Sequence, residues 1–183
     1  LSSAASDVYK RQTIYIDMIT TNYNGRSDDA DINDVVKITI IDDNGKILLN
    51  TYVYPCHATS DAWEIALFYN NITKLEINRA PNLDIVIANV RDIIASADNI
   101  VMYNVDKVHN YFQKWGITPI TIIDASARFS KKCMCTMPLL PLPTIARDCN
   151  YFTSIDDYVM CRNHHDTYQY AMMLRHIYHH AIR

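Results

Sequence analysis

Apolar residues in the first part of the chain occur in short runs rich in β-branched side chains, which is typical of strands. One run covers 13–19, and two more cover 34–42 and 46–54. Between the second and third runs, Asp42-Asp43-Asn44-Gly45 is a strong turn signal, and Pro55 ends the third run. The pattern predicts three successive strands that begin an antiparallel arrangement, with the last two forming a tight hairpin.

The spacing of apolar residues then changes to that of helices. Ser60 is expected to cap a short helix over 61–69, and Pro81 suits the first turn of a longer one. One apolar face of that longer helix is formed by Ile85, Val86, Val90, Ile93 and Ile94.

The middle of the chain alternates strands with a helix. Strands are predicted at 100–103 and 119–124, and a helix over 107–115 between them ends at Gly116, which suits a C-terminal cap. The two strands are short and apolar, so they are expected to be buried.

The C-terminal part is predicted to be helical. Residues 136–150 contain three prolines and read as a loop that leads into a short helix. Ser154, three residues before Asp157, resembles a capping box for a helix near 155–161, and a last helix covers 165–182. The resulting order, β-β-β-α-α-β-α-β followed by helices, predicts an α/β fold in which helices cover a mixed sheet.

Composition narrows the class of protein. The 183 residues are 49% hydrophobic and 20% charged, which predicts one globular domain. The net charge of -3 provides no global basic field, so binding to nucleic acid would need a local basic patch or metal ions. No apolar run reaches the ~18 residues that span a bilayer, so we expect a soluble protein without membrane contact.

The cysteines and the N-terminus complete this picture. An odd count of five cysteines predicts reduced thiols and a cytoplasmic setting, and Cys133-Met-Cys135 is too tight for a usual zinc site, so buried thiols are favoured. Residues 1–12 have no apolar core and are not a signal peptide. They resemble translated sequencing-adapter sequence, and we interpret them as a non-native or disordered extension of a single domain over 13–183.

Three segments in order carry a family resemblance. They read IYIDMITTN at 14–22, IVMYNVDKVHNYF at 100–112 and HDTYQYA at 165–171. Together with the predicted hairpin, they resemble the three motifs of the DEDD 3′–5′ exonucleases of the histidine subtype (DEDDh), such as ribonuclease T and the proofreading epsilon subunit. The resemblance implies a ribonuclease-H-like five-stranded sheet, three antiparallel strands then two parallel, flanked by helices.

The same resemblance implies a hydrolase site that this chain keeps only in part. In the family, four carboxylates hold two divalent metal ions, and a histidine is the general base. Asp17 matches the first acid and His165 the base, whereas Ile19, Val108 and Tyr170 replace the other three acids. Because magnesium prefers several charged oxygen ligands, Asp17 alone is expected to be a weak metal ligand. Mg²⁺ or Mn²⁺ is implied only if activity remains.

Nearby acids are possible substitutes. Asp106 lies two residues before the Val108 position, and its alternative role is to cap the helix that follows. Asp166 lies one helical turn before Tyr170. Asp124 ends a predicted strand, where the family commonly has a structural aspartate.

Several other residues have both a functional and a structural interpretation. Thr20, Thr21 and Asn104 stand beside the motif positions and are candidates for nucleic-acid contact, and so is the basic run of Arg128, Lys131 and Lys132. That run is equally compatible with a solvated face.

Aromatic and histidine clusters also leave two interpretations open. Tyrosines near the motifs either stack on bases or pack in place of the lost acids, with packing favoured; they are Tyr103, Tyr111, Tyr168 and Tyr170. His176 and His180 have a spacing that permits metal binding, but no third ligand is evident, so solvated surface histidines are favoured for the set His164, His165, His176, His179 and His180.

Three functional hypotheses follow. The leading one is a pseudoenzyme: an exonuclease-like domain, catalytically impaired, that binds single-stranded nucleic acid or assists a polymerase or other replication protein. The second is an active magnesium-dependent 3′–5′ exonuclease that uses displaced acids. The third is a protein–protein interaction module.

Overall fold

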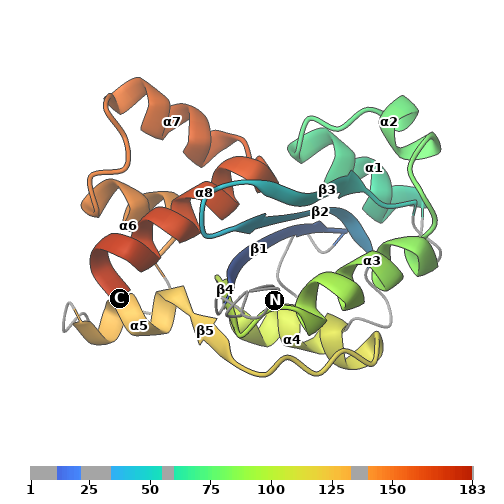
Figure 1. The fold of residues 1–183 in the computed structure, drawn as a ribbon. Helices are drawn as coiled ribbons and strands as arrows, with labels where there is room; N and C mark the ends of the chain where they lie inside the picture. Colours follow the sequence, from blue (N-terminus) through green and yellow to red (C-terminus); the bar gives the residue numbers. More distant parts are fainter. Residues whose placement is uncertain (1–11, 22–33, 55–59, 133–139, 183) are drawn as a thin grey trace, which may run out of the picture.

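The structure, a computed structural model, describes residues 12–21, 34–54, 60–132 and 140–182. Its centre is a mixed sheet with the order β3-β2-β1-β4-β5 (Figure 1). β1 pairs antiparallel with β2, β2 antiparallel with β3, and β4 and β5 continue parallel to β1. The strands are β1 (Thr13–Thr20), β2 (Val35–Asp42), β3 (Ile47–Tyr52), β4 (Asn99–Met102) and β5 (Ile122–Asp124). The predicted ribonuclease-H-like sheet, three antiparallel strands and then two parallel, is confirmed.

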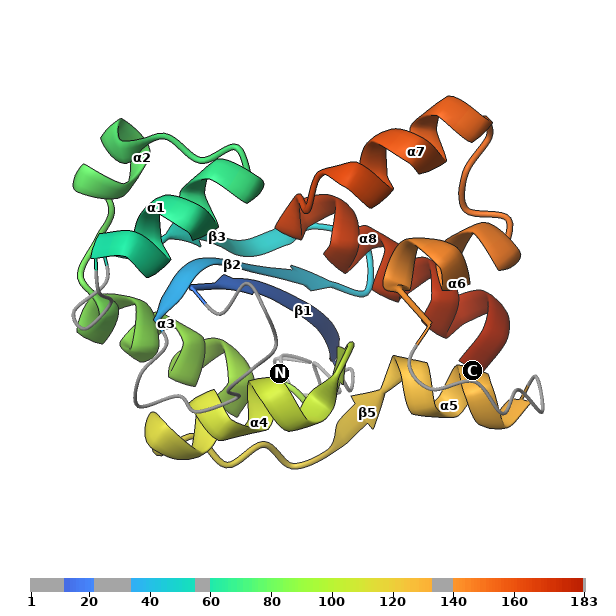
Figure 2. The same cartoon turned by 180° about the vertical axis from the view of Figure 1, so that it is seen from behind.

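Helices cover both faces of this sheet. Two lie under one face and three pack on the other, while a further pair stands beside the antiparallel strands (Figures 1 and 2). The remaining helix, over Ile155–Asn163, packs against one of these three, the helix over Leu142–Asp148. The helices are α1 (Ser60–Tyr69), α2 (Lys74–Asn78), α3 (Leu83–Ala95), α4 (Val105–Lys114), α5 (Ala125–Lys132), α6 (Leu142–Asp148), α7 (Ile155–Asn163) and α8 (Thr167–Ile177), and α8 continues into a π-helical turn, η1 (Tyr178–Ile182). None of the helices in these described ranges is long and apolar enough to cross a membrane.

β1 is buried on both sides, which explains why its sequence is an apolar run without clean alternation. Ile14 and Ile16 pack against α3 and α4, and Tyr15 packs against α8 on the opposite face. Ile19, near the end of the strand, belongs to a third cluster with residues of α1 and α2. Full burial of each isoleucine stabilises the fold by about 1.5–3 kcal/mol, so β1 holds the three clusters together.

Three local signals act as the sequence predicts. In the hairpin turn, the Gly45 N–H donates to the Asp42 carbonyl at 3.0 Å, and Gly45 has the positive φ of 83° that favours glycine. The Asp42 carboxylate accepts from two further turn N–H groups. Ser154 caps α7, because its Oγ accepts from the Asp157 N–H at 3.1 Å. Gly116 follows α4 with φ 62°, as expected of a C-terminal cap.

Other element boundaries differ from the prediction. Pro81 precedes α3, whose N-cap is Asn82, and α4 begins at Val105 after the N-cap Asn104. Asp106 therefore lies inside the first turn of α4 and is not its cap. The last helix begins at Thr167, because the Asp166 carboxylate caps it.

Two helices are absent from the prediction. α2 begins at a capping box in which the Thr73 hydroxyl accepts from the Glu76 N–H, and the Glu76 carboxylate accepts from the Thr73 N–H. α5 follows β5 directly, so the basic run lies on a helix. Some predictions fall outside the described backbone or side chains: the extension up to residue 11, the Ser60 cap, Pro55, Cys56, Cys133 and Cys135.

Candidate functional site

Asp17 and His165 lie 148 positions apart in the sequence and meet in the fold. The His165 Nε2 and the Asp17 Oδ2 are 2.6 Å apart, with side chains 31% and 11% exposed. Asp17 is presented by β1, and His165 stands just before the N-terminus of α8, which packs across β1. The ring of Tyr170, on the first turns of α8, stacks on His165 with ring centroids 4.0 Å apart.

These residues line a cavity of about 340 Å³, here called the Asp17 cavity. One wall is β1 and the start of α4, and the opposite wall is the segment that enters α6. The lining residues are Ile16, Asp17, Met18, Thr20, Tyr103, Asn104, Val108, Pro141, Leu142, Pro143, His165 and Tyr170. The pairing of β1 with β4 ends at Ile16 and Met102, so the cavity begins where β1 loses that neighbour.

Two further polar groups of the cavity are available to a ligand. The Thr20 Oγ1 is buried and has no hydrogen-bond partner among the residues that the structure describes. Asn104 adopts a left-handed conformation with φ 56°, and its side chain makes no capping hydrogen bond to α4. Buried unpaired hydroxyls and strained backbone both occur preferentially at functional sites.

The three positions that lack an acid do not form one packed cluster. Ile19 is 3% exposed and packs beside Leu67 and Ile77 in the cluster of α1 and α2. Val108 belongs to the core under α3 and α4 and also lines the Asp17 cavity. Tyr170 occupies the space beside His165. Ile19, Val108 and Tyr170 therefore each pack against different neighbouring residues.

The donor set of the cavity does not fit two divalent metal ions. It contains one carboxylate, already bonded to an imidazole, together with the amide of Asn104 and three hydroxyl groups, those of Thr20, Tyr103 and Tyr170. In the described part of the chain, no three His, Cys, Asp or Glu side chains are grouped so that they share a metal ion. Hard divalent cations require several oxygen ligands, preferably charged, so this donor set is a poor site for a pair of them.

The acids considered as substitutes have other contacts. The Asp166 carboxylate caps α8 and lies 3.4 Å from the Lys37 ammonium. The Asp124 carboxylate accepts from the Ser126 N–H at 2.8 Å and so begins α5. Asp106 is exposed on the first turn of α4. None of the three lines the Asp17 cavity.

The tyrosines of the cavity are held neutral. Burial, followed by the charge of Asp17, raises the pKa of Tyr170 well above its ordinary value. Burial and the charge of Asp124 raise the pKa of Tyr103 to about 12. The Tyr103 hydroxyl donates to the Leu140 carbonyl at 2.6 Å and so ties β4 to the segment that enters α6. Tyr111, in contrast, is a core residue, 3% exposed.

The other predicted contact residues lie away from the cavity. The Thr21 hydroxyl accepts from the Asp34 N–H at 3.0 Å and closes the start of β2. Arg128, Lys131 and Lys132 lie on α5, exposed, and do not line the Asp17 cavity.

The interpretation of the C-terminal histidines as solvated is wrong for three of them, the first being His165, which is bonded to Asp17. His176 donates from Nε2 to the Cys149 carbonyl at 2.8 Å, and His179 lies 2.8 Å from the Asp43 carboxylate. His164 and His180 are exposed, as predicted.

Comparison with known proteins bears on the fold. No protein-family model and no curated protein matches the sequence. A solved structure, concerned with 3′-end specific recognition of a histone mRNA stem-loop by a 3′-exonuclease, superimposes with a TM-score of 0.63 at 11% sequence identity. The chain has a 3′-exonuclease fold. The match covers 91% of this chain but only 62% of that one, so this chain spans less than two thirds of its length.

Within this exonuclease fold, sequence reasoning missed the second wall of the cavity. Pro141, Leu142 and Pro143 reach it from α6, and nothing local in their sequence indicates contact with β1. The short helix predicted to follow the loop within 136–150 is present as α6, with Pro141 at its N-cap and Pro143 in its first turn, but the sequence does not indicate that its start lines this cavity.

Proposed function

We propose that this chain is a catalytically impaired member of the DEDDh exonucleases that binds single-stranded nucleic acid in the Asp17 cavity. One observation carries the proposal: Val108 and Tyr170, at two positions where the family resemblance implies acids, line the cavity beside the Thr20 Oγ1, which has no hydrogen-bond partner in the described chain. Ile19, at the third such position, is buried in another cluster. Loss of metal ligands would abolish hydrolysis and leave contacts to sugar and phosphate in place. The structural neighbour's recognition of an RNA stem-loop supports nucleic acid as the ligand class.

The chemistry of the cavity suits the end of a strand. Thr20 offers a buried hydroxyl, Asn104 offers an amide, and the Asp17 carboxylate with His165 can accept from or donate to ribose hydroxyls. Tyr103 and Tyr170 present ring surface on the same cavity, and base stacking on aromatic side chains stabilises a bound strand by about 1–3 kcal/mol per base.

The test uses a single-stranded RNA and a DNA of the same sequence, each labelled at the 5′ end. With Mg²⁺ or Mn²⁺, the labelled strand is expected to stay at full length, and fluorescence anisotropy is expected to show binding that weakens as salt is raised. The active-enzyme hypothesis predicts 3′ shortening that Asp17→Ala abolishes, and that result would overturn the proposal.

A matched pair of threonine variants locates the binding. Thr20→Val removes the unpaired hydroxyl and is expected to weaken strand binding about three- to tenfold, the equivalent of about one hydrogen bond. Thr51→Val is the control, because Thr51 lies on β3 and its hydroxyl donates to the Tyr52 carbonyl. Equal weakening by both variants would place the strand elsewhere.

A second function, as an accessory to a polymerase or another replication protein, has a separate observation in its favour. α1 exposes large apolar side chains, including Phe68, which is 82% exposed, with Ile65 and Tyr69 beside it. Exposed apolar groups of this kind occur at protein interfaces. Phe68→Ser is expected to leave strand binding unchanged and to weaken any complex formed through α1, which analytical ultracentrifugation measures.

A further inference from the structure

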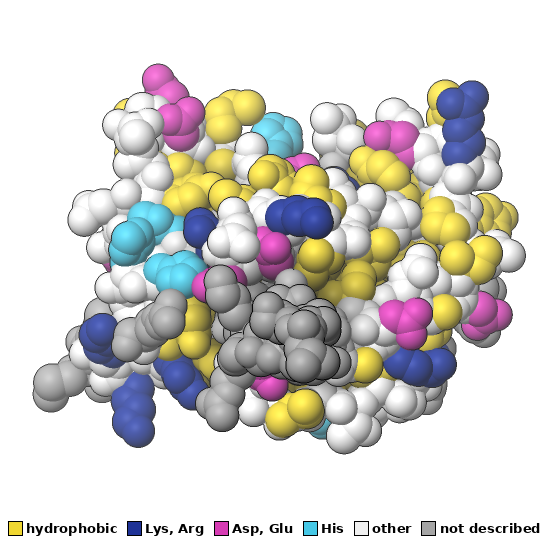
Figure 3. Space-filling model, viewed as in Figure 1, with side chains coloured by type: hydrophobic (Ala, Val, Ile, Leu, Met, Phe, Trp, Pro, Cys, Tyr) yellow, Lys and Arg dark blue, Asp and Glu magenta, His cyan; other side chains and the backbone are white. Residues whose placement is uncertain are grey.

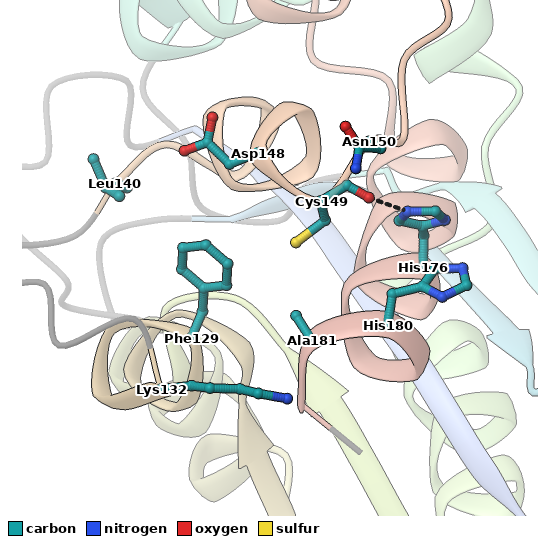
Figure 4. Close-up of a pocket in the computed structure, with 9 residues that line it drawn as sticks. All are labelled: Phe129, Lys132, Leu140, Asp148, Cys149, Asn150, His176, His180 and Ala181. Atoms are coloured by element: carbon teal, nitrogen blue, oxygen red, sulfur yellow. Dashed lines mark hydrogen bonds between the residues drawn. The ribbon is translucent and has the colours of Figure 1, made fainter.

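A second and larger cavity lies at the opposite end of α8, between α5, α6 and η1. Its volume is about 870 Å³, within the range of about 300–1,000 Å³ that holds small ligands in other proteins. We call it the α5–α6–η1 pocket. It is lined by Phe129, Lys132, Leu140, Asp148, Cys149, Asn150, His176, His180 and Ala181 (Figure 4).

The floor of this pocket is apolar. The Phe129 ring, the Cys149 side chain and Ala181 point into the same space from three different elements (Figure 4). Leu140 adds an aliphatic wall, and the next residue, Pro141, lines the Asp17 cavity. A small residue opposite an aromatic ring leaves a slot that suits a flat ring system.

The α5 side of the pocket rim is basic. No carboxylate within the described ranges forms an ion pair with Lys132, whereas Asp148 is bound by the guanidinium of Arg147 at 2.9 Å. Arg128 and Lys131 share α5 with Lys132. Figure 3 shows Lys and Arg side chains gathered near histidines at this end of the molecule. A chain with a net charge of -3 therefore carries a local basic patch here.

His176 and His180 do not act as a metal pair in this arrangement. Their rings stand edge to face with centroids 4.1 Å apart, and His176 uses its Nε2 to donate to the Cys149 carbonyl. Burial lowers the pKa of His176, which favours a neutral ring whose role is to hold α6 against α8. Among the lining residues that the structure describes, the polar groups left for a ligand are the Lys132 ammonium and the Asn150 amide, because the His180 ring lies beside His176.

From this geometry we infer that the α5–α6–η1 pocket binds a nucleotide, with the base on the apolar floor and the phosphate at Lys132. The Asn150 amide can both donate to and accept from the edge of a base. A free nucleoside monophosphate and one nucleotide of a strand both combine a base with a phosphate, so either could bind in this way. The inference does not depend on strand binding in the Asp17 cavity, because the two cavities share none of their lining residues.

The test titrates the whole chain with AMP, adenosine and inorganic phosphate, measured by calorimetry. AMP is expected to bind at least about tenfold more tightly than either fragment, because only AMP uses both the floor and the rim. Lys132→Ala is expected to weaken AMP about five- to tenfold, as for loss of a partly exposed charged contact. Lys131→Ala is the control, since Lys131 is exposed on the same helix and does not line the pocket.

A chemical readout places the ligand. AMP is expected to protect the Cys149 thiol from alkylation by iodoacetamide and to leave Cys161 unprotected, because Cys161 lies outside the pocket. Phosphate binding as tightly as AMP, equal weakening by Lys131→Ala, or no protection of Cys149 would each overturn the inference.

Two further outcomes separate this site from the first. If Thr20→Val weakens AMP and Lys132→Ala does not, AMP occupies the Asp17 cavity, and the inference fails while the proposed function stands. If the pocket binds AMP, competition by a single-stranded oligonucleotide identifies its ligand as a nucleotide of a strand, and absence of competition identifies it as the free nucleotide.

Discussion

Placing at position 19 the glutamate that the family resemblance implies is expected to destabilise the protein strongly. Ile19 is 3% exposed and packs among apolar residues of β2, α1 and α2. Ile19→Glu loses about 2 kcal/mol of apolar burial and places a carboxyl group without a partner in the same space, which costs a further ~2–3 kcal/mol even when the group is neutral. The free energy of unfolding should therefore fall by about 4–5 kcal/mol.

Urea unfolding followed by circular dichroism measures this loss. With a slope of about 2 kcal/mol per molar urea, the midpoint should fall by about 2 M. Ile19→Val is the conservative control and should cost only about 0.5–1.5 kcal/mol. Ile19→Gln separates shape from charge: because burial raises the pKa of the new carboxyl group, the Glu variant should lose stability relative to Gln as the pH rises above about 4.3.

Two results would contradict this reasoning. An unchanged midpoint for Ile19→Glu would mean that position 19 opens to solvent or to the Asp17 cavity. The second such result is that Mg²⁺ raises the urea midpoint of Ile19→Glu and does not change that of Ile19→Gln. It would mean that Asp17 and the new carboxylate bind the ion together, so that one substitution creates a metal site.

Three other perturbations test separate parts of the structure. Asp17→Ala should lower the pKa of Tyr170, because the charge of Asp17 helps to raise it, and should reduce the free energy of unfolding by about 1–3 kcal/mol. NMR of labelled tyrosines measures the pKa of Tyr170, and an unchanged titration of Tyr170 would contradict its contact with Asp17. Burial raises the pKa of Tyr15 and of Tyr170 above 10. The contribution of these two side chains to folding stability should therefore be constant below about pH 10 and fall above it, by up to about 1.4 kcal/mol per pH unit for each. If the urea midpoint of Tyr170→Phe falls as steeply above pH 10 as that of the unchanged protein, Tyr170 has no part in the loss. Ser154→Ala should lower the free energy of unfolding by about 0.5–2 kcal/mol because α7 loses its N-cap, whereas Ser154→Asp should keep most of the capping stabilisation. Equal urea midpoints for the two variants would show that the cap does not stabilise the protein.

Local chemistry is what made parts of the fold predictable. The turn at Asp42 to Gly45 is determined by hydrogen bonds within five residues, so its sequence was enough. α2 had an equally local signal in Thr73 and Glu76, which was overlooked. α5 had a weaker one, because Asp124 caps it directly from a strand, and Phe129 is its one large buried apolar side chain.

The candidate site could be predicted only through the family resemblance. Asp17 and His165 carry no sign of each other in their local sequence, and their contact depends on α8 packing across β1. The α5–α6–η1 pocket could not be predicted from the family resemblance. Phe129, Cys149 and His180 come from three helices whose meeting depends on tertiary packing, and no spacing rule relates them.

The end of the β1–β4 pairing at Ile16 and Met102 has a consequence for how such a site changes over time. From Asp17 onward, in the described chain, β1 is paired with β2 on one side, and the peptide groups of its other edge lie beside the cavity. Those amide and carbonyl groups are the same whatever side chains the strand carries. Substitution can remove every acid from this strand and still leave its backbone available to a ligand. Sequence comparison detects changes in side chains only, so it would not detect a binding function that depends on these backbone groups.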